Sequence, residues 1–125
     1  MKAIVVPTSL SESLSIIDLG DRELDSFYKH IGCDCIDYVA IYADDRVSID
    51  VIVDDEGLLN GSPINEYWKR ACENGQANYP LAGRTVITMT DRISGDTCDL
   101  DIPLITHVLY TLYAFDLKDL LCLVK

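Results

Sequence analysis

VSIDVIVDDEGLLNGSPINEYWKRA, residues 47–71, is the stretch that decides the fold. Apolar residues alternate along residues 47–53, which is the period of a β-strand with one buried face. The acidic turn at residues 55–57 ends this strand, and Gly57 is expected to take the positive φ that a chain reversal needs. Asn65 then stands where a helix N-cap belongs, ahead of good helix formers. The stretch therefore predicts a strand, a tight acidic turn and a helix.

A second strand is predicted immediately before this stretch. Residues 35–42 are rich in β-branched and aromatic side chains. Only residues 43–46 separate them from the strand at 47–53, so the two strands are expected to pair as an antiparallel hairpin. Three further strands are expected, with the first two paired to each other, at residues 3–6, 14–19 and 84–90.

Helical spacing and capping residues predict the other elements. Asp21 is expected to cap a helix at residues 22–30, which Gly32 ends. Asp101 and Pro103 favour a helix start before the apolar spacing of the C-terminal segment. The remaining elements are a helix at 66–72, a loop at 73–82, a polar turn at 91–99, a helix at 104–114 and a short helical turn after Asp116. We expect one α+β domain over residues 1–125, a mostly antiparallel sheet of four to five strands with helices packed on one face.

The chain is strongly acidic, and the excess lies mainly in its first half. Its 125 residues include 10 Lys and Arg and 21 Asp and Glu, a net charge of −11. Met1 to Ser62 hold thirteen acidic and four basic residues, a balance of −9, whereas Pro63 to Lys125 hold eight and six, a balance of −2. Such a chain is repelled by nucleic acid and by anionic membranes, so we expect neither as a direct partner.

Nothing in the sequence predicts export or membrane insertion. The N-terminal apolar run is short and reads as a strand, and no stretch approaches the roughly 20 apolar residues of a membrane span. Five cysteines, an odd number, are expected to be reduced thiols of a cytoplasmic protein.

Several matching residues indicate a family resemblance over residues 2–91. An acidic-Glu-Gly turn follows a strand at Asp55, Glu56 and Gly57, and a Pro-x-Asn helix start follows at Pro63 and Asn65. A later Gly-x-x-Val-Ile element occupies residues 83–87. In these features the chain resembles domain of unknown function 3846. The resemblance implies a protein of bacteria and their phages or mobile elements, with no established activity, whose matching residues mark the fold.

Three kinds of reactive site were weighed against simpler readings. His30, Cys33 and Cys35 could supply zinc ligands, with a fourth from elsewhere, but their tight spacing favours buried reduced thiols. A cysteine nucleophile would need His30 or His107 as its base, and His107 is expected to be a core or boundary residue of its helix. A magnesium or calcium site at Asp50, Asp54, Asp55 and Glu56 lacks the spacing of an EF-hand, which favours solvated turn carboxylates. We expect no metal and no cofactor.

The acidic field remains as the functional signal. We expect a non-enzymatic protein that binds a protein partner with a basic surface through an acidic face around one hairpin tip. DNA mimicry in defence of a phage or mobile element would be one use of such a face, because carboxylates can imitate backbone phosphates. The contact residues would be Asp44, Asp45, Asp54, Asp55 and Glu56. The alternative is a module that binds a small molecule or nucleotide in a pocket between sheet and helices.

Overall fold

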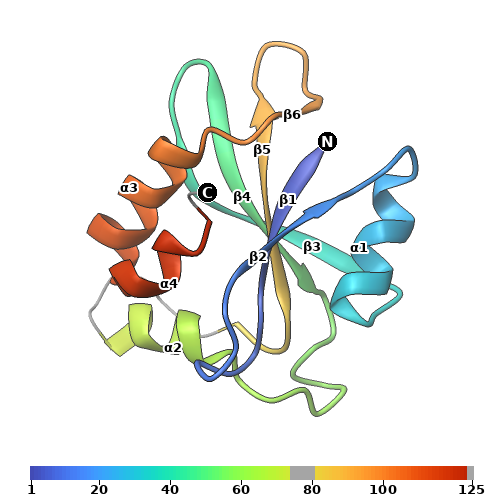
Figure 1. The fold of residues 1–125 in the computed structure, drawn as a ribbon. Helices are drawn as coiled ribbons and strands as arrows, with labels where there is room; N and C mark the ends of the chain where they lie inside the picture. Colours follow the sequence, from blue (N-terminus) through green and yellow to red (C-terminus); the bar gives the residue numbers. More distant parts are fainter. Residues whose placement is uncertain (74–80, 124–125) are drawn as a thin grey trace.

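An antiparallel sheet forms the centre of the computed structural model, which describes residues 1–73 and 81–123. Over these residues the sheet has six strands in the order β2-β1-β5-β4-β3, and β6 pairs with β5 beyond the end of β1 (Figure 1). The strands are β1 (Lys2–Val6), β2 (Ser15–Asp18), β3 (Ile36–Ala43), β4 (Val47–Asp54), β5 (Thr85–Asp91) and β6 (Thr97–Cys98).

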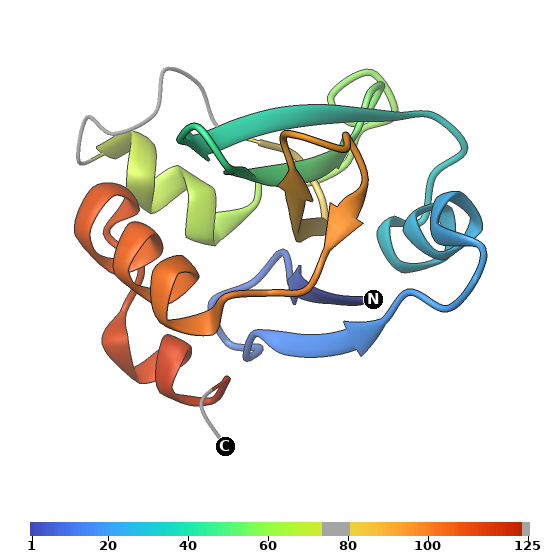
Figure 2. The same cartoon turned by 90° about the horizontal axis from the view of Figure 1, so that it is seen from above.

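Helices cover both faces of this sheet. α2 (Glu66–Glu73), α3 (Ile102–Tyr113) and α4 (Leu117–Leu121) gather on one face, and α1 (Glu23–Ile31) lies on the other (Figures 1 and 2). The predicted α+β class and antiparallel sheet are confirmed. The expectation that helices share one face holds for α2, α3 and α4, and α1 adds a second, smaller layer. None of the helices in the described part of the chain is long and apolar enough to cross a membrane.

β4 is buried on both sides because each face of the sheet has its own apolar core. Ile49 and Val51 point into the core beneath α2–α4, while Ile52 points into the core beneath α1. All three side chains are fully buried. The alternation in the sequence predicted only one buried face, because a helix packing on the second face leaves no mark within the strand itself.

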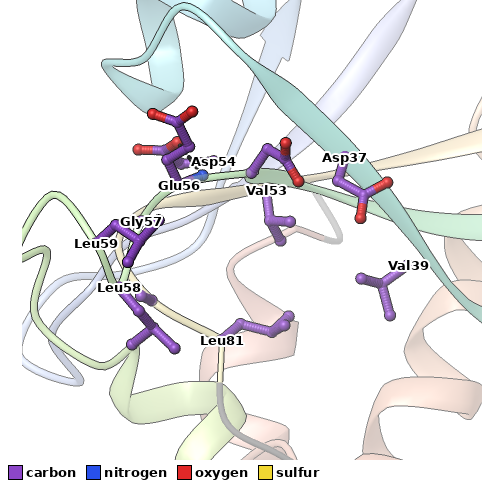
Figure 3. Close-up of a pocket in the computed structure, with 11 residues that line it drawn as sticks. Asp37, Val39, Val53, Asp54, Glu56, Gly57, Leu58, Leu59 and Leu81 are labelled. Atoms are coloured by element: carbon purple, nitrogen blue, oxygen red, sulfur yellow. Dashed lines mark hydrogen bonds between the residues drawn. The ribbon is translucent and has the colours of Figure 1, made fainter.

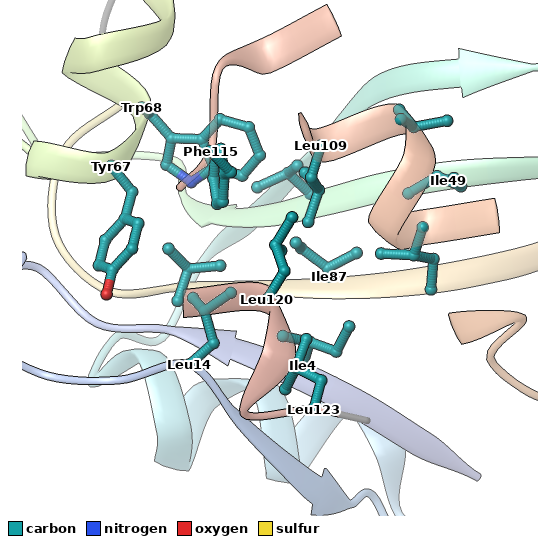
Figure 4. Packing of buried hydrophobic residues seen from close by; sticks show 14 of the residues in the cluster. Ile4, Leu14, Ile49, Tyr67, Trp68, Ile87, Leu109, Phe115, Leu120 and Leu123 are labelled. Carbon is teal, nitrogen blue, oxygen red and sulfur yellow. The ribbon is translucent and has the colours of Figure 1, made fainter. Parts of the chain in front are cut away.

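The larger core is built around aromatic side chains from separate elements. Trp68 of α2 meets Phe115, which follows α3, edge to face at a centroid distance of 4.8 Å (Figure 4). Tyr67 lies 5.5 Å from the same ring, and its burial raises the pKa of its hydroxyl to about 12. The indole Nε1 of Trp68 donates a 2.9 Å hydrogen bond to Thr85 Oγ1, which ties α2 to β5. Phe115 thereby joins the C-terminal segment to the sheet.

Asn65 is the buried connection between three parts of the chain. Its amide nitrogen donates to the carbonyls of Pro7 at 3.1 Å, Gly83 at 2.9 Å and Val6 at 3.4 Å. Its Oδ1 accepts from the backbone N–H groups of Tyr67 and of the residue after it, as an N-cap does. The side chain is fully buried, so these groups have no water to replace the bonds. The predicted cap is confirmed, and it also joins the end of β1 to the start of β5.

Some local predictions were wrong in instructive ways. Gly57 does not take a positive φ; Gly61 does, at 76°. A Cβ on Gly57 would instead lie 3.3 Å from the Cβ of Ala82, so close packing explains that glycine. Arg22 rather than Asp21 occupies the N-cap of α1, without a side-chain hydrogen bond.

Other boundaries agree closely with expectation. The Gly32 stop, the Asp101 cap and the helix after Asp116 are all present. β6 was missed because a two-residue strand inside a polar turn has no periodicity to detect. Of the predicted loop at 73–82, residues 74–80 lie outside the described residues.

Replacing Asn65 with alanine is expected to lower the free energy of unfolding by about 3–5 kcal/mol, because it leaves buried carbonyl and N–H groups without partners. Urea unfolding followed by circular dichroism measures this loss. Asn60→Ala is the matched control and should cost little, since Asn60 is exposed and the hydrogen bond that it donates within the described residues comes from its backbone N–H. A loss below about 1 kcal/mol for Asn65→Ala would contradict the structural role given to this side chain.

Candidate functional site: an acidic pocket at the open end of a hairpin

The five predicted contact residues lie at the two ends of the β3–β4 hairpin. Asp44 and Asp45 belong to its turn, whereas Asp54 is the last residue of β4 and Asp55 and Glu56 follow it at the open end. Eight residues of extended strand separate the groups, a distance of roughly 25 Å. The expectation of one acidic patch around one hairpin tip is therefore wrong, since the strand carries its flanking carboxylates in opposite directions. Their role as contact residues stays a prediction.

At the turn end, the carboxylate of Asp44 is hydrogen-bonded to neighbouring residues of the hairpin. Its carboxylate accepts from the backbone N–H groups of Val47 at 2.9 Å and Arg46 at 2.8 Å and from the hydroxyl of Tyr42 at 2.8 Å. These hydrogen bonds hold the pKa of Asp44 below its usual value. The guanidinium of Arg92 also donates to the Asp44 backbone carbonyl. Asp44 therefore builds the turn.

At the open end the carboxylates surround a pocket. Four acidic side chains line a hollow of about 370 Å³ together with aliphatic ones. In Figure 3 the carboxylates of Asp37, Asp54 and Glu56 lie on one side, and Val39, Leu58 and Leu81 lie on the other. The full lining is Asp37, Val39, Val53, Asp54, Asp55, Glu56, Gly57, Leu58, Leu59, Leu81 and Ala82. One side of the pocket is thus anionic, and its other side is apolar.

A hydrogen-bonded turn holds one wall of this pocket. Asp54 Oδ1 accepts from the Glu56 N–H at 2.9 Å, and the Asn60 N–H donates to the Glu56 carbonyl at 2.8 Å. The turn nevertheless leaves Leu58 and Leu59 exposed, at 67% and 88% of their surface. Two adjacent exposed leucines on an ordered turn are a costly arrangement in water, so they mark a surface suited to contact.

A second segment of the lining, next to this turn, is positioned by the buried asparagine of the fold. The Asn65 N–H donates to the Leu81 carbonyl at 2.8 Å, and Ile64 forms a bridge with Ala82. The Gly83 N–H donates to the Pro63 carbonyl at 2.7 Å. Leu81 and Ala82 line the pocket, so the same contacts that start α2 also set the width of the site.

No ion pair within residues 1–73 and 81–123 neutralises a carboxylate of the pocket. Among the described residues, the ion pairs involve the carboxylates of Asp18, Asp25 and Asp119 and none that lines the pocket. The negative charge of the pocket affects the pKa of the nearby Cys35 thiol. Its pKa is raised, first by desolvation and then by the carboxylates of Asp34, Glu56, Asp55 and Asp54. The open end of the hairpin is therefore a concentrated negative field, and the part of the chain that the structure describes forms no ion pair with it.

Asp50 is separate from both groups. Its carboxylate lies within the sheet, 9% exposed, and Oδ2 accepts from the hydroxyls of Ser48 at 3.1 Å and Thr90 at 2.8 Å. The predicted solvated turn carboxylate is therefore wrong for Asp50, because it sits in the middle of β4. Together with the separation of Asp54, this removes Asp50 from the magnesium or calcium set considered in the sequence.

The other reactive candidates are not brought together. Within residues 1–73 and 81–123 no group of three or more His, Cys, Asp or Glu side chains could hold a metal ion. Desolvation is the largest cause that raises the thiol pKa of Cys33, and it is also the largest cause for Cys35. His107 is exposed on α3 rather than at a core position, 3.5 Å from Thr111 Oγ1. All five cysteines are free thiols, but the expectation that they are buried is wrong, since two are exposed and three are half-buried.

Sequence reasoning missed the apolar half of the pocket. Leu58 and Leu59 lie between turn residues, and their placement there was a signal, because a leucine pair seldom occurs in an exposed turn without a contact to make. Asp37 and Leu81 could not have been assigned, since only the register of β3 on β4 and the contacts of Asn65 bring them to the same pocket.

The fold and the site define a class of protein: a small acidic α+β domain whose antiparallel sheet ends in an anionic, apolar-walled pocket. The chain belongs to the family described as domain of unknown function (DUF3846), whose model matches residues 1–111. The resemblance seen in the sequence is thus confirmed, and the matching residues Pro63, Asn65 and Gly83 are structural connections. No curated protein matches the chain. No solved structure matches it either.

The Cys35 thiol offers a direct measure of the field at the pocket. In a background with Cys33 replaced by serine, the paired substitution Asp55→Asn and Glu56→Gln is expected to lower the pKa of Cys35, because two of the carboxylates that raise it lose their charge. The pH dependence of alkylation, with the modified cysteine identified by mass spectrometry, measures that pKa. The control pair Asp21→Asn and Asp45→Asn changes the net charge equally, away from the pocket. An equal shift in both pairs would refute a localised field.

Proposed function

We propose that the protein is a non-enzymatic binding protein whose pocket at the open end of the β3–β4 hairpin holds a basic and apolar segment of a partner protein. The observation that carries this proposal is the lining of the pocket, with four carboxylates opposite a group of aliphatic side chains. This narrows the acidic contact expected from the sequence to Asp54, Asp55 and Glu56, joined by Asp37. The turn residues Asp44 and Asp45 lie outside it.

The chemistry of the lining selects the ligand. An arginine or lysine side chain combines an aliphatic stem with a cationic head, so its stem can lie along Val39 and Leu81 while its head meets the carboxylates. The planar guanidinium of arginine is favoured over lysine, since its fixed donors can bond two carboxylate oxygens at once. An apolar neighbour in the same segment would cover Leu58 and Leu59.

The same lining disfavours the alternative of a nucleotide-binding module. Phosphates would approach four carboxylates with no basic residue among the lining side chains. The described residues that line the pocket also include no thiol, hydroxyl or imidazole, which supports binding rather than nucleophilic chemistry. DNA mimicry calls for an extended row of anions, whereas the hairpin divides its carboxylates between two ends. A segment of protein is the better fit.

A short peptide of alternating arginine and leucine tests the proposal by calorimetry. We expect it to bind at low salt and to bind more weakly at physiological salt, because the attraction is electrostatic. Asp55→Asn with Glu56→Gln should weaken binding by roughly tenfold or more, as two charge-assisted contacts are lost. Asp21→Asn with Asp45→Asn, which changes the net charge equally, should have little effect.

Two serine substitutions, one in the pocket and one away from it, test the apolar half of the pocket. Leu59→Ser should weaken binding of the peptide. Ile93→Ser should not, although Ile93 in the β5–β6 turn is similar in size to leucine and is 83% exposed. No binding by the unaltered protein, or equal weakening by both acidic pairs, would overturn the proposal. Binding of free arginine amide as tight as that of the peptide would also overturn it, in favour of a small cationic molecule.

A further inference from the structure

α3 is an exposed helix without a charged residue. None of its twelve residues is Asp, Glu, Lys or Arg. Its inner side buries Ile105, Val108 and Leu109 in the larger core, while His107 and Tyr110 are exposed. The solvent side of a surface helix normally carries charges. The lack of any charge on α3 therefore calls for an explanation beyond packing on the sheet.

Exposed apolar side chains continue from α3 onto α4. Tyr110 is 54% exposed, Leu117 is 46% exposed and Leu121 is 59% exposed. Tyr110 and Leu117 line the same open hollow at the junction of the two helices, and Leu121 lies one turn after Leu117 on the same side of α4. We call Tyr110, Leu117 and Leu121, with the charged residues that flank them, the α3–α4 face.

The charges that flank this face are balanced. Arg70 Nη2 lies 3.7 Å from Asp119 Oδ2, which pairs one base with one acid inside the chain. Lys118 and Asp116 supply one further charge of each sign. The protein as a whole carries −11, so two copies repel each other across most orientations. At the α3–α4 face the charges named above cancel, and apolar surface is available there.

We propose that two copies of this chain associate through their α3–α4 faces. A two-fold axis brings the same patch of each copy together, so a partner surface must be complementary to itself. A face with one further charge of each sign meets this condition, because Lys118 of each copy can approach the carboxylate of Asp116 of the other, whose Oδ1 also caps α4. A second copy is the occupant that this self-complementary face suits, because the excess negative charge of each molecule lies mainly in residues 1–62, outside α3 and α4. The inference is independent of the proposed pocket ligand.

Sedimentation velocity over a range of protein concentrations tests this association. We expect dimers to form as concentration rises and to tighten with added salt, since salt screens the repulsion between two acidic molecules. Binding at the pocket has the opposite dependence on salt, so the two proposals can fail separately. A protein that stays monomeric at every concentration and at high salt would overturn the inference.

Matched serine pairs locate the interface. Leu117→Ser with Leu121→Ser is expected to weaken the dimer by tenfold or more, and Leu24→Ser with Ile93→Ser, at exposed apolar side chains elsewhere, should leave it unchanged. Lys118→Glu makes the face acidic and should likewise favour monomers. Circular dichroism checks that each variant is folded. Equal weakening by the two serine pairs would contradict the assignment of this face.

Discussion

The structure depends on one buried side chain, Asn65. Its amide links the end of β1 to the start of β5, and its carbonyl oxygen starts α2. A single backbone group is either a donor or an acceptor. The asparagine amide carries donors and an acceptor on the same side chain, so it can bond all of these segments at once. A position that must satisfy three buried segments at once therefore admits few other residues.

This constraint also shapes the pocket. The Asn65 backbone holds Leu81, and the neighbouring bridge from Ile64 holds Ala82, so that one wall is fixed by the same contacts that close the core. The other wall is the turn after β4, which packs closely because Gly57 has no Cβ. The acidic side chains themselves contribute little to this framework. They are placed by a scaffold whose stability comes from elsewhere, and this leaves their charge available for a ligand.

Much of the fold was predictable because its signals are local. The β3–β4 hairpin, the Asn65 and Asp101 caps and the Gly32 stop each follow from residues adjacent in sequence. The second core under α1, the two-residue β6 and the pocket lining were not predictable, since each depends on contacts between distant segments. The charge excess was read correctly from the composition, but its distribution was not. A strand between two acidic groups separates them, and only the register of the sheet, which pairs Asp37 with Val53, brings Asp37 to the pocket that Asp54 also lines.

The most direct measurement is a titration of the isotopically labelled protein with the arginine-leucine peptide, followed by backbone and methyl NMR shifts. A pocket of anionic and apolar walls predicts that the largest changes fall on Glu56, Leu59 and Leu81, with the hairpin turn at Asp44 and Asp45 nearly unaffected. Changes centred on that turn, or spread evenly over the acidic residues of the surface, would contradict the account.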